Sequence, residues 1–332
     1  MILAGDVGGT KSHLALVKSQ GGKISIVWEK RYASGDFSSF NALINQLKKD
    51  LKLDQCNLKQ LTHSVFAIAG PIHNNSCHTT NLPWFIDGEQ LSNQLGVEEV
   101  RLLNDVEAIA LGIPHLNRQQ LVPLTPWTQG EDQKAIALIA PGTGLGESAL
   151  FWTGKGYQAQ ASEGGHKDFT ACSTQEFALK QFAAERFKGH VSIERILGGD
   201  GFTLIYDFLR HKGGTPANEV EDARGQQSNT NAIITHLALT KQNALCEEVL
   251  ALYVSLLAAE CANLALQYMS LGGVVIAGGI PPKILPALLR QGFLTRYLAK
   301  GRYKSILETI PVFVCTEERS ALIGAAGCDG AC

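Results

Sequence analysis

The segment Val100-Arg101-Leu102-Leu103-Asn104-Asp105-Val106-Glu107-Ala108-Ile109-Ala110 predicts a buried strand that ends on two polar side chains and turns directly into a helix. Asp105 then follows the carboxyl end of a strand, where open α/β sheets bind their ligands. A carboxylate in that place can accept a proton from a bound hydroxyl. The pattern Asn104-x-x-Glu107 also fits a capping box, in which Asp105 is an ordinary acid of the first helical turn. From this segment alone, the capping interpretation is the simpler one.

The composition is that of an ordinary folded protein. The 332 residues are enough for two domains, and 45% of them are hydrophobic and 18% charged. A net charge of −2 predicts no nucleic-acid and no membrane surface. Residues 1–6 show no export signal. Polar residues interrupt the apolar segment 249–266, so we expect a buried helix at 249–266 and no membrane span. Eight cysteines without a C-x-x-C pair favour reduced thiols in the cytoplasm.

Two similar runs of secondary structure follow each other along the chain. In the first run we expect strands at 2–6, 12–17, 24–32 and 65–69 and helices at 38–53 and 87–95, before the opening segment. In the second we expect strands at 134–140, 147–152, 156–161 and 274–277, and helices at 174–187, 201–211, 232–240, 244–269 and from 281 to about 298. Residues 212–229 are expected to be a surface connection. The order predicts two α/β domains with a cleft between them, and we expect the final strand (312–315) and helix (320–327) to return to the first domain.

Three glycine turns, at 6–10, 142–146 and 278–279, each follow a predicted buried strand. Glycine lets backbone N–H groups approach an anion without a Cβ in the way, and Thr10 and Thr143 add hydroxyl donors. The last turn is expected to lead into a helix N-terminus, a natural phosphate site. Any one turn alone is better interpreted as a tight hairpin. The three together favour phosphate binding.

Two familiar nucleotide motifs are excluded. Residues 5–12 nearly spell a P-loop, but Thr10 stands where the last glycine belongs, and a strand follows where a P-loop needs a helix. Residues 142–146 do not form the G-x-G-x-x-G fingerprint of dinucleotide-binding proteins. A GTPase and a dehydrogenase are therefore both disfavoured.

The motifs taken together resemble the bacterial glucokinase family. They run in order from residue 5 to residue 280: Gly5-Asp6-Val7-Gly8-Gly9-Thr10, Leu103-Asn104-Asp105, Pro141-Gly142-Thr143-Gly144-Leu145-Gly146, Glu163-Gly164-Gly165-His166, His190-Val191-Ser192-Ile193-Glu194-Arg195 and Ile276-Ala277-Gly278-Gly279-Ile280. The resemblance implies an α/β, two-domain, actin-like (RNase H-like) fold of the hexokinase type with an interdomain cleft. Its implied domains are a small one at 1–112 and 308–332 and a large one at 113–307. It also implies ATP, magnesium, cytoplasmic phosphorylation of glucose and a homodimer.

The resemblance also implies roles for individual residues. Asp105 would be the catalytic base for the primary hydroxyl of the sugar, and Asp6 would face the magnesium through water. Residues that resemble the family's sugar-hydroxyl binders are Asn104, Glu163, His166 and Glu194, with Asn81 as a further lining residue. Residues that resemble its phosphate-side positions are Gly5, Asp6, Val7, Gly8, Gly9, Thr10, Gly142, Thr143 and Gly279.

Simpler interpretations stay open for several of these residues. Glu194 could be a first-turn acid, His166 a loop histidine with its hydrogen bonds satisfied, and Asp6 a cap of its own turn. Only Cys172 follows His166, so the zinc cluster of the related repressor/open-reading-frame/kinase family is not expected, nor is that family's DNA-binding helix pair before the first strand. The alternatives to a kinase are a sugar sensor and an ATPase without a sugar substrate. The sequence leaves open glucose against other hexoses, and ATP against ADP or polyphosphate.

Overall fold

The computed structural model describes residues 1–20, 23–54, 60–226 and 228–328. The chain forms two compact units, each of which is described by itself. Unit 1 consists of Met1–Asn117, Trp152–Ala161 and Glu317–Cys332, and unit 2 consists of Arg118–Phe151 and Ser162–Thr316.

Unit 1 is built on a five-stranded mixed sheet with the strand order β3-β2-β1-β4-β7. The strands β1 (Ile2–Val7), β4 (His63–Ile68) and β7 (Glu99–Asn104) are parallel, and β2 (Lys11–Gln20) and β3 (Lys23–Ala33) extend the sheet in antiparallel fashion. Val7 pairs with Ile68, and Ile68 pairs with Asn104. The three parallel strands therefore end at one edge of the sheet, where open α/β sheets bind ligands.

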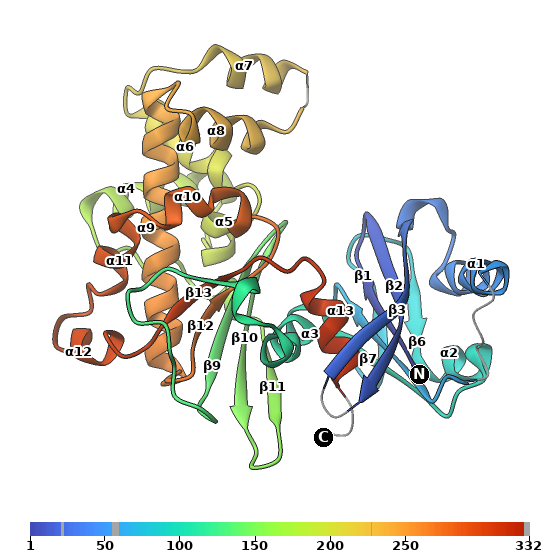
Figure 1. Cartoon of the computed structure of the whole chain (residues 1–332). Helices are drawn as coiled ribbons and strands as arrows, with labels where there is room; N and C mark the ends of the chain where they lie inside the picture. Colours follow the sequence, from blue (N-terminus) through green and yellow to red (C-terminus); the bar gives the residue numbers. More distant parts are fainter. Residues whose placement is uncertain (21–22, 55–59, 227, 329–332) are drawn as a thin grey trace. The chain divides into compact units, whose positions relative to one another are not determined.

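Helices cover both faces of this sheet. Successive residues of a strand point to opposite faces, so Leu3 packs with α1 (Phe40–Leu53) and α2 (Gly88–Leu95). Its neighbour Ala4 packs with α3 (Asp105–Gly112) and α13 (Ser320–Gly327), which lie side by side (Figure 1). The remaining elements of unit 1 are η1 (Ser34–Asp36), β5 (Ser76–His78), β6 (Phe85–Asp87) and η3 (Ile113–His115).

The crossing of α3 and α13 requires glycine. A Cβ added at Gly324 would lie 1.8 Å from the carbonyl oxygen of Ala108, and a Cβ added at Gly112 would lie 2.2 Å from the carbonyl oxygen of Ser320. No larger residue fits without moving a helix backbone. This close packing fixes α3, the helix that begins at Asp105.

The second sheet has the order β11-β10-β9-β12-β13-β8 and repeats the arrangement of the sheet in unit 1. It belongs to unit 2 except for residues 152 and 157–161, at the end of β10 and in β11, which group with unit 1. Its strands are β8 (Leu121–Pro123), β9 (Ile136–Pro141), β10 (Leu145–Trp152), β11 (Tyr157–Ser162), β12 (Gly273–Ile276) and β13 (Val312–Cys315). As in unit 1, an antiparallel pair, here β9 and β10, is followed by parallel strands, here β12 and β13. The two similar runs of secondary structure predicted from the sequence therefore form two sheets of similar topology.

The last strand and the last helix belong to different units. The sequence led us to expect both in the first domain, and for α13 the packing against β1 agrees. For β13 the expectation was wrong, because Val312 and Val314 pair with Val274 and Ile276 of β12 in unit 2. Strand partners are long-range contacts, and the local sequence of β13 carries no information about them.

Helices fill the rest of unit 2 around α9 (Ala244–Gln267). By length and composition α9 could cross a membrane, but 72% of its most apolar window is buried within the structure. We therefore interpret it as the core helix that the sequence predicted. The other helical elements are η4 (Arg118–Gln120), η5 (Gly164–His166), α4 (Thr174–Phe187), α5 (Ile193–Leu197), α6 (Gly201–His211), α7 (Asn218–Gly225), α8 (Thr230–Leu239), η6 (Pro281–Ile284), α10 (Leu285–Leu288), α11 (Gln291–Tyr297), η7 (Gly301–Tyr303) and α12 (Lys304–Leu307).

Two predicted segments of unit 2 differ from the structure. The surface connection expected at 212–229 contains α7, which buries only Val220 and Ala223, so its apolar signal is weak. The single helix expected from 281 to about 298 is divided into η6, α10 and α11. Pro286 contributes to this division because it cannot donate the backbone hydrogen bond of a continuous helix.

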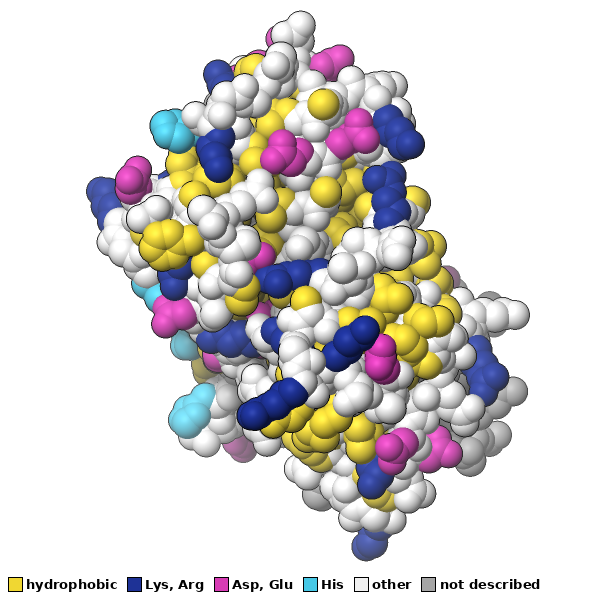
Figure 2. All heavy atoms as spheres, turned by 90° about the vertical axis from the view of Figure 1, so that its left-hand side faces the viewer, with side chains coloured by type: hydrophobic (Ala, Val, Ile, Leu, Met, Phe, Trp, Pro, Cys, Tyr) yellow, Lys and Arg dark blue, Asp and Glu magenta, His cyan; other side chains and the backbone are white. Residues whose placement is uncertain are grey.

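The surface carries charges of both signs, as expected for a protein with a net charge of −2. Figure 2 shows Lys and Arg side chains interspersed with Asp and Glu side chains and with hydrophobic ones. The cysteines that the structure describes, Cys77, Cys172, Cys246, Cys261, Cys315 and Cys328, are free thiols. Cys56 and Cys332 lie outside the described residues.

Candidate active site

The junction of β7 and α3 carries Asn104 and Asp105, as the sequence predicted. The side-chain oxygen of Asn104 accepts hydrogen bonds from the backbone N–H groups of Val106, at 3.0 Å, and Glu107, at 3.4 Å. Its Nδ2 donates to the carbonyl oxygen of Gly70 at 3.2 Å. Asn104 is therefore the N-cap of α3, and the capping interpretation is confirmed. Capping holds Asp105 in the first turn of α3 without excluding a role in chemistry.

Asp6 comes to the same edge of the sheet from β1. Burial, and then the negative charge of Asp105, raise the pKa of the Asp6 carboxyl to about 6, against the lowering effect of Arg31. Two carboxyl groups that repel each other in a half-buried place are a functional-site signal, since structural acids are normally paired with cations.

The donor set around Asp6 fits a magnesium ion held largely by water. A divalent cation would relieve the repulsion between Asp6 and Asp105, and carboxylate oxygen is the ligand type that magnesium prefers. Among the described residues, no three His, Cys, Asp or Glu side chains converge on a point that could hold a metal. Magnesium commonly keeps several waters and takes one or two carboxylates together with substrate phosphates. Asp6 is the residue here that would face it.

The first glycine turn, between β1 and β2, is closed by its own backbone. The N–H of Gly8 donates to the carbonyl oxygen of Lys11 at 3.0 Å, and the hydroxyl of Ser34 donates to the carbonyl oxygen of Gly8 at 2.8 Å. A Cβ added at Gly9 would lie 2.6 Å from the Cβ of Asn81, so the turn and Asn81 are in contact. Thr10 and Lys11 are exposed. The predicted residues Gly5, Asp6, Val7, Gly8, Gly9, Thr10 and Asn81 thus lie on unit 1 with Asn104 and Asp105.

Unit 2 brings Glu194 to Glu163 and His166, which lie three residues apart on one turn. The Nε2 of His166 lies 3.8 Å from a carboxylate oxygen of Glu163, and its Nδ1 lies 3.8 Å from one of Glu194. The side chains of Glu163 and His166 are 77% and 61% exposed, so they are available to a ligand. The second oxygen of Glu194 accepts from the N–H of Leu145 at 3.1 Å.

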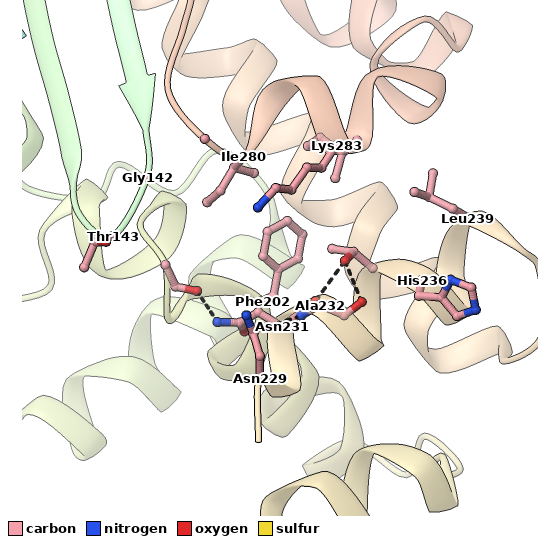
Figure 3. Close-up of a pocket in the computed structure, with 14 residues that line it drawn as sticks. Gly142, Thr143, Phe202, Asn229, Asn231, Ala232, His236, Leu239, Ile280 and Lys283 are labelled. Atoms are coloured by element: carbon pink, nitrogen blue, oxygen red, sulfur yellow. Dashed lines mark hydrogen bonds between the residues drawn. The ribbon is translucent and has the colours of Figure 1, made fainter. Parts of the chain in front are cut away.

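The second glycine turn and the third form one wall of a cavity of about 520 Å³ in unit 2. Gly142 and Thr143 lie on this wall (Figure 3). Gly279 also lines the cavity. A Cβ added at Gly142 or at Gly279 would meet nothing within 4 Å, so packing within the protein does not require glycine at either position. Glycine leaves open space there for the backbone to be approached by a ligand. The expected long helix after Gly279 is instead the short η6, so the third turn is not followed by a long helix dipole.

The rest of this cavity was not identified from the sequence. Figure 3 shows the ring of Phe202 below Ile280 and Lys283, with Asn231 beside it and His236 and Leu239 at the far side. The Nδ2 of Asn231 donates to the carbonyl oxygen of Gly199, at 2.6 Å. The sequence predicted α6 and α8 as helices, but it holds no signal for which of their faces would line a cavity.

Comparison with known proteins gives matches over nearly the whole chain. The family model described as Glucokinase matches residues 3–330. The glucokinase of Nostoc punctiforme is 38% identical over 343 residues, covering 99% of this chain and 98% of that protein. The glucokinase of Tolumonas auensis is 33% identical, covering 97% and 95%.

The chain belongs to the glucokinase family. The predicted enzyme class, a sugar kinase and thus a phosphotransferase, is confirmed by this membership.

Solved structures of glucokinases share the fold. The crystal structure of a glucokinase from an Antarctic psychrotroph superposes with a TM-score of 0.85 at 28% identity, covering 98% of each chain. The glucokinase of Balamuthia mandrillaris, solved with glucose, has a TM-score of 0.78 at 18% identity and covers 98% of this chain and 92% of its own. The predicted two-domain fold of the hexokinase type is therefore confirmed.

Proposed function

We propose that the chain transfers the γ-phosphoryl group of ATP to the 6-hydroxyl of glucose, with Asp105 as the general base. The observation that carries the proposal is the position of Asp105. In a glucokinase-family chain, it follows the carboxyl end of β7 at the sheet edge reached by Asp6, and its charge raises the pKa of Asp6.

Asp105 would accept the proton of the hydroxyl as its oxygen attacks the γ-phosphorus in line. A positioned base contributes about 10²–10⁴ in rate. The hydrogen bonds of Asn104 to Val106 and Glu107 hold the first turn of α3 and so support the orientation of Asp105. Sequestering the acceptor from water prevents hydrolysis of ATP from competing.

The remaining hydroxyls of the sugar need partners that both donate and accept. Asn104, Glu163, His166 and Glu194 supply this chemistry, and we assign them to hydroxyl binding, with Asn81 as a further lining residue. The contacts of His166 with both carboxylates support a shared role for those three side chains.

The cavity beside the second and third glycine turns favours a nucleoside donor over bare polyphosphate. Its lining includes the apolar side chains of Phe202, Leu239 and Ile280, together with amides and hydroxyls that suit a base and a ribose. We assign the phosphate chain to Gly142, Thr143 and Gly279 in unit 2 and to the Gly5–Thr10 segment in unit 1. Asp6 would hold magnesium through water, and the metal supplies charge neutralisation on the transferring group.

Two further properties are proposed from family membership alone. They are a homodimeric assembly and a location in the cytoplasm.

Release of ADP that depends on a sugar tests the proposal directly. The purified chain is assayed with glucose, mannose, glucosamine and fructose as acceptors, and with ATP, ADP and polyphosphate as donors. We expect ADP release from ATP that depends on glucose and on Mg²⁺, with little turnover in the absence of sugar. Equal ADP release with and without glucose would favour an ATPase. Glucose binding without any ADP release would favour a sensor.

A further inference from the structure

An ionic network of two buried carboxylates and one partly exposed ammonium lies next to the turn that carries Glu163 and His166. The ammonium of Lys167 lies 2.8 Å from Oε2 of Glu147 and 2.5 Å from Oε1 of Glu260. The side chain of Glu147 is 1% exposed and that of Glu260 is 6% exposed. The network joins β10, which carries Glu147, to α9, which carries Glu260. It therefore connects the strand beneath the turn to the core helix of unit 2.

The turn rests on the carboxylate of Glu147. A Cβ added at Gly164 would lie 2.1 Å from Oε2 of Glu147, the oxygen that binds Lys167. A Cβ added at Gly165 would lie 2.1 Å from the carbonyl oxygen of Leu145, two residues before Glu147 on the same strand. The Glu147 carboxylate therefore supports the backbone of the turn between Glu163 and His166 by direct contact.

The backbone of Lys167 connects the same turn to Glu194. Its carbonyl oxygen accepts a hydrogen bond from the N–H of Ile193 at 2.9 Å, next to Glu194 in the chain. Phe169 and Val191 continue this pairing, with an N–H to carbonyl distance of 2.8 Å. Lys167 thus stands between two of the proposed sugar-binding elements, with its side chain in the network and its backbone in the pairing.

The two buried carboxylates depend on the ammonium between them. Burial raises the pKa of Glu147 to about 6, Lys167 lowers it, and Glu260 raises it. Removing one partner of a buried ion pair leaves an uncompensated charge and is strongly disruptive. Without Lys167, Glu147 and Glu260 would lose the cation that they share, and their repulsion would disfavour the present position of the Glu147 carboxylate against Gly164.

We infer that Lys167 is a positioning residue, which fixes Glu163, His166 and Glu194 for the hydroxyls of the sugar through its contacts with Glu147, Glu260 and Ile193. The inference rests on the proposed function, because it takes those three side chains as sugar binders. Lys167 touches no substrate in this role. Its removal should weaken sugar binding and leave the chemical step largely intact.

The variants Lys167→Met and Lys167→Arg test the inference by separating KM from kcat. We expect Lys167→Met to raise KM for glucose about tenfold, because small displacements of binding groups are costly. The Kd for glucose, measured by calorimetry, should rise by the same factor. The KM for ATP and kcat should stay within about twofold of the wild-type values. Lys167→Arg keeps a cation between the carboxylates and should restore most of the glucose affinity. A loss of kcat at unchanged KM would overturn the inference.

Lys300→Met is the matched control. Lys300 lines the same cavity of about 530 Å³ as Lys167 and Glu260. Its ammonium donates to the side-chain oxygen of Asn263, and Nδ2 of Asn263 donates to Glu260 at 2.9 Å. Lys300 therefore belongs to the outer end of the network. Lys300→Met should leave KM for glucose unchanged. An equal rise of KM in this control would mean that any damage to the network has the same effect, and would overturn a specific role for Lys167.

Glu147→Gln keeps the experiment decisive if Lys167→Met does not fold. The amide has the shape of the carboxylate but binds the ammonium more weakly, so we expect KM for glucose to rise about threefold at constant kcat. A wild-type KM in this variant would contradict the inference. If the wild-type chain does not phosphorylate glucose at all, the proposed function fails first, and that result is distinct from a wild-type KM in the variants.

Discussion

Burial and the negative charge of Asp105 raise the pKa of the Asp6 carboxyl to about 6, although Asp6 lies on β1 and Asp105 begins α3. The parallel pairing of β1 with β4 and of β4 with β7 brings them to the same sheet edge. Each carboxyl group is costly beside the other unless a cation or a proton compensates. This relationship links the stability of unit 1 to its proposed chemistry.

The first prediction concerns the pH dependence of stability. Since the pKa of Asp6 is raised from 3.8 to about 6, the folded protein binds more protons than the unfolded chain between these values. The contribution of Asp6 to the free energy of unfolding is therefore lost as pH rises through this window. Asp6→Asn should remove that loss and be more stable than the wild type at pH 7, by up to about 3 kcal/mol. Denaturant unfolding from pH 4 to pH 8 measures the difference, and a difference independent of pH would contradict it.

The second prediction separates the two roles of Asn104. Asn104→Ala removes the cap of α3 and should lower the free energy of unfolding by about 1–2 kcal/mol. Asn104→Ser keeps a good cap and should lower it by less than about half of that amount. Both variants lose the amide assigned to the sugar, so both should raise KM for glucose by a similar factor. If serine restored the wild-type KM, capping alone would explain Asn104.

The third prediction concerns the crossing of α3 and α13. Gly324→Ala would place a Cβ 1.8 Å from the carbonyl oxygen of Ala108 and should destabilise unit 1 by about 1–3 kcal/mol or more. Because α3 carries Asp105, kcat should fall as well. Gly292→Ala is the control, since its Cβ meets nothing within 4 Å and alanine favours the helix α11. Thermal unfolding compares the two, and equal midpoints would refute the packing argument.

The fourth prediction compares two neighbouring glycines. Gly278 has φ +87°, and a Cβ there would lie 2.5 Å from the carbonyl oxygen of Pro141, so Gly278→Ala should destabilise unit 2. A Cβ at Gly279 meets nothing within 4 Å, so Gly279→Ala should leave thermal stability unchanged. If phosphate approaches this backbone, Gly279→Ala should still raise KM for ATP about tenfold. An unchanged KM for ATP would remove Gly279 from the phosphate side.

Local patterns in the sequence predicted local structure well. The bounds expected for α4 and α6 agree with the structure, because α4 begins after the N-cap Ser173 and α6 has a well-defined apolar face. The capping box at Asn104 and Glu107 was likewise legible, since its residues are neighbours in the chain. Pro286 illustrates the limit of periodicity, because the apolar spacing continues through a residue that interrupts the helix.

Long-range relationships could not be predicted in this way. Nothing within β13 indicates that its partner is β12, and nothing within α6 indicates that Phe202 faces a cavity. The network of Lys167, Glu147 and Glu260 joins three separate elements and leaves no local pattern. The sequence motifs identified the glycine turns and the polar residues. The fold determines which of these residues lie close together within each unit.

Turnover of Asp105→Ala tests the central claim most directly. Glu89→Ala is the matched control, because Glu89 is also a first-turn acid of a helix capped after a strand, in α2 of the same unit. We expect Asp105→Ala to fold and to bind glucose by calorimetry, while kcat falls by about 10²–10⁴ and Glu89→Ala keeps wild-type kcat. Wild-type turnover in Asp105→Ala would contradict the account.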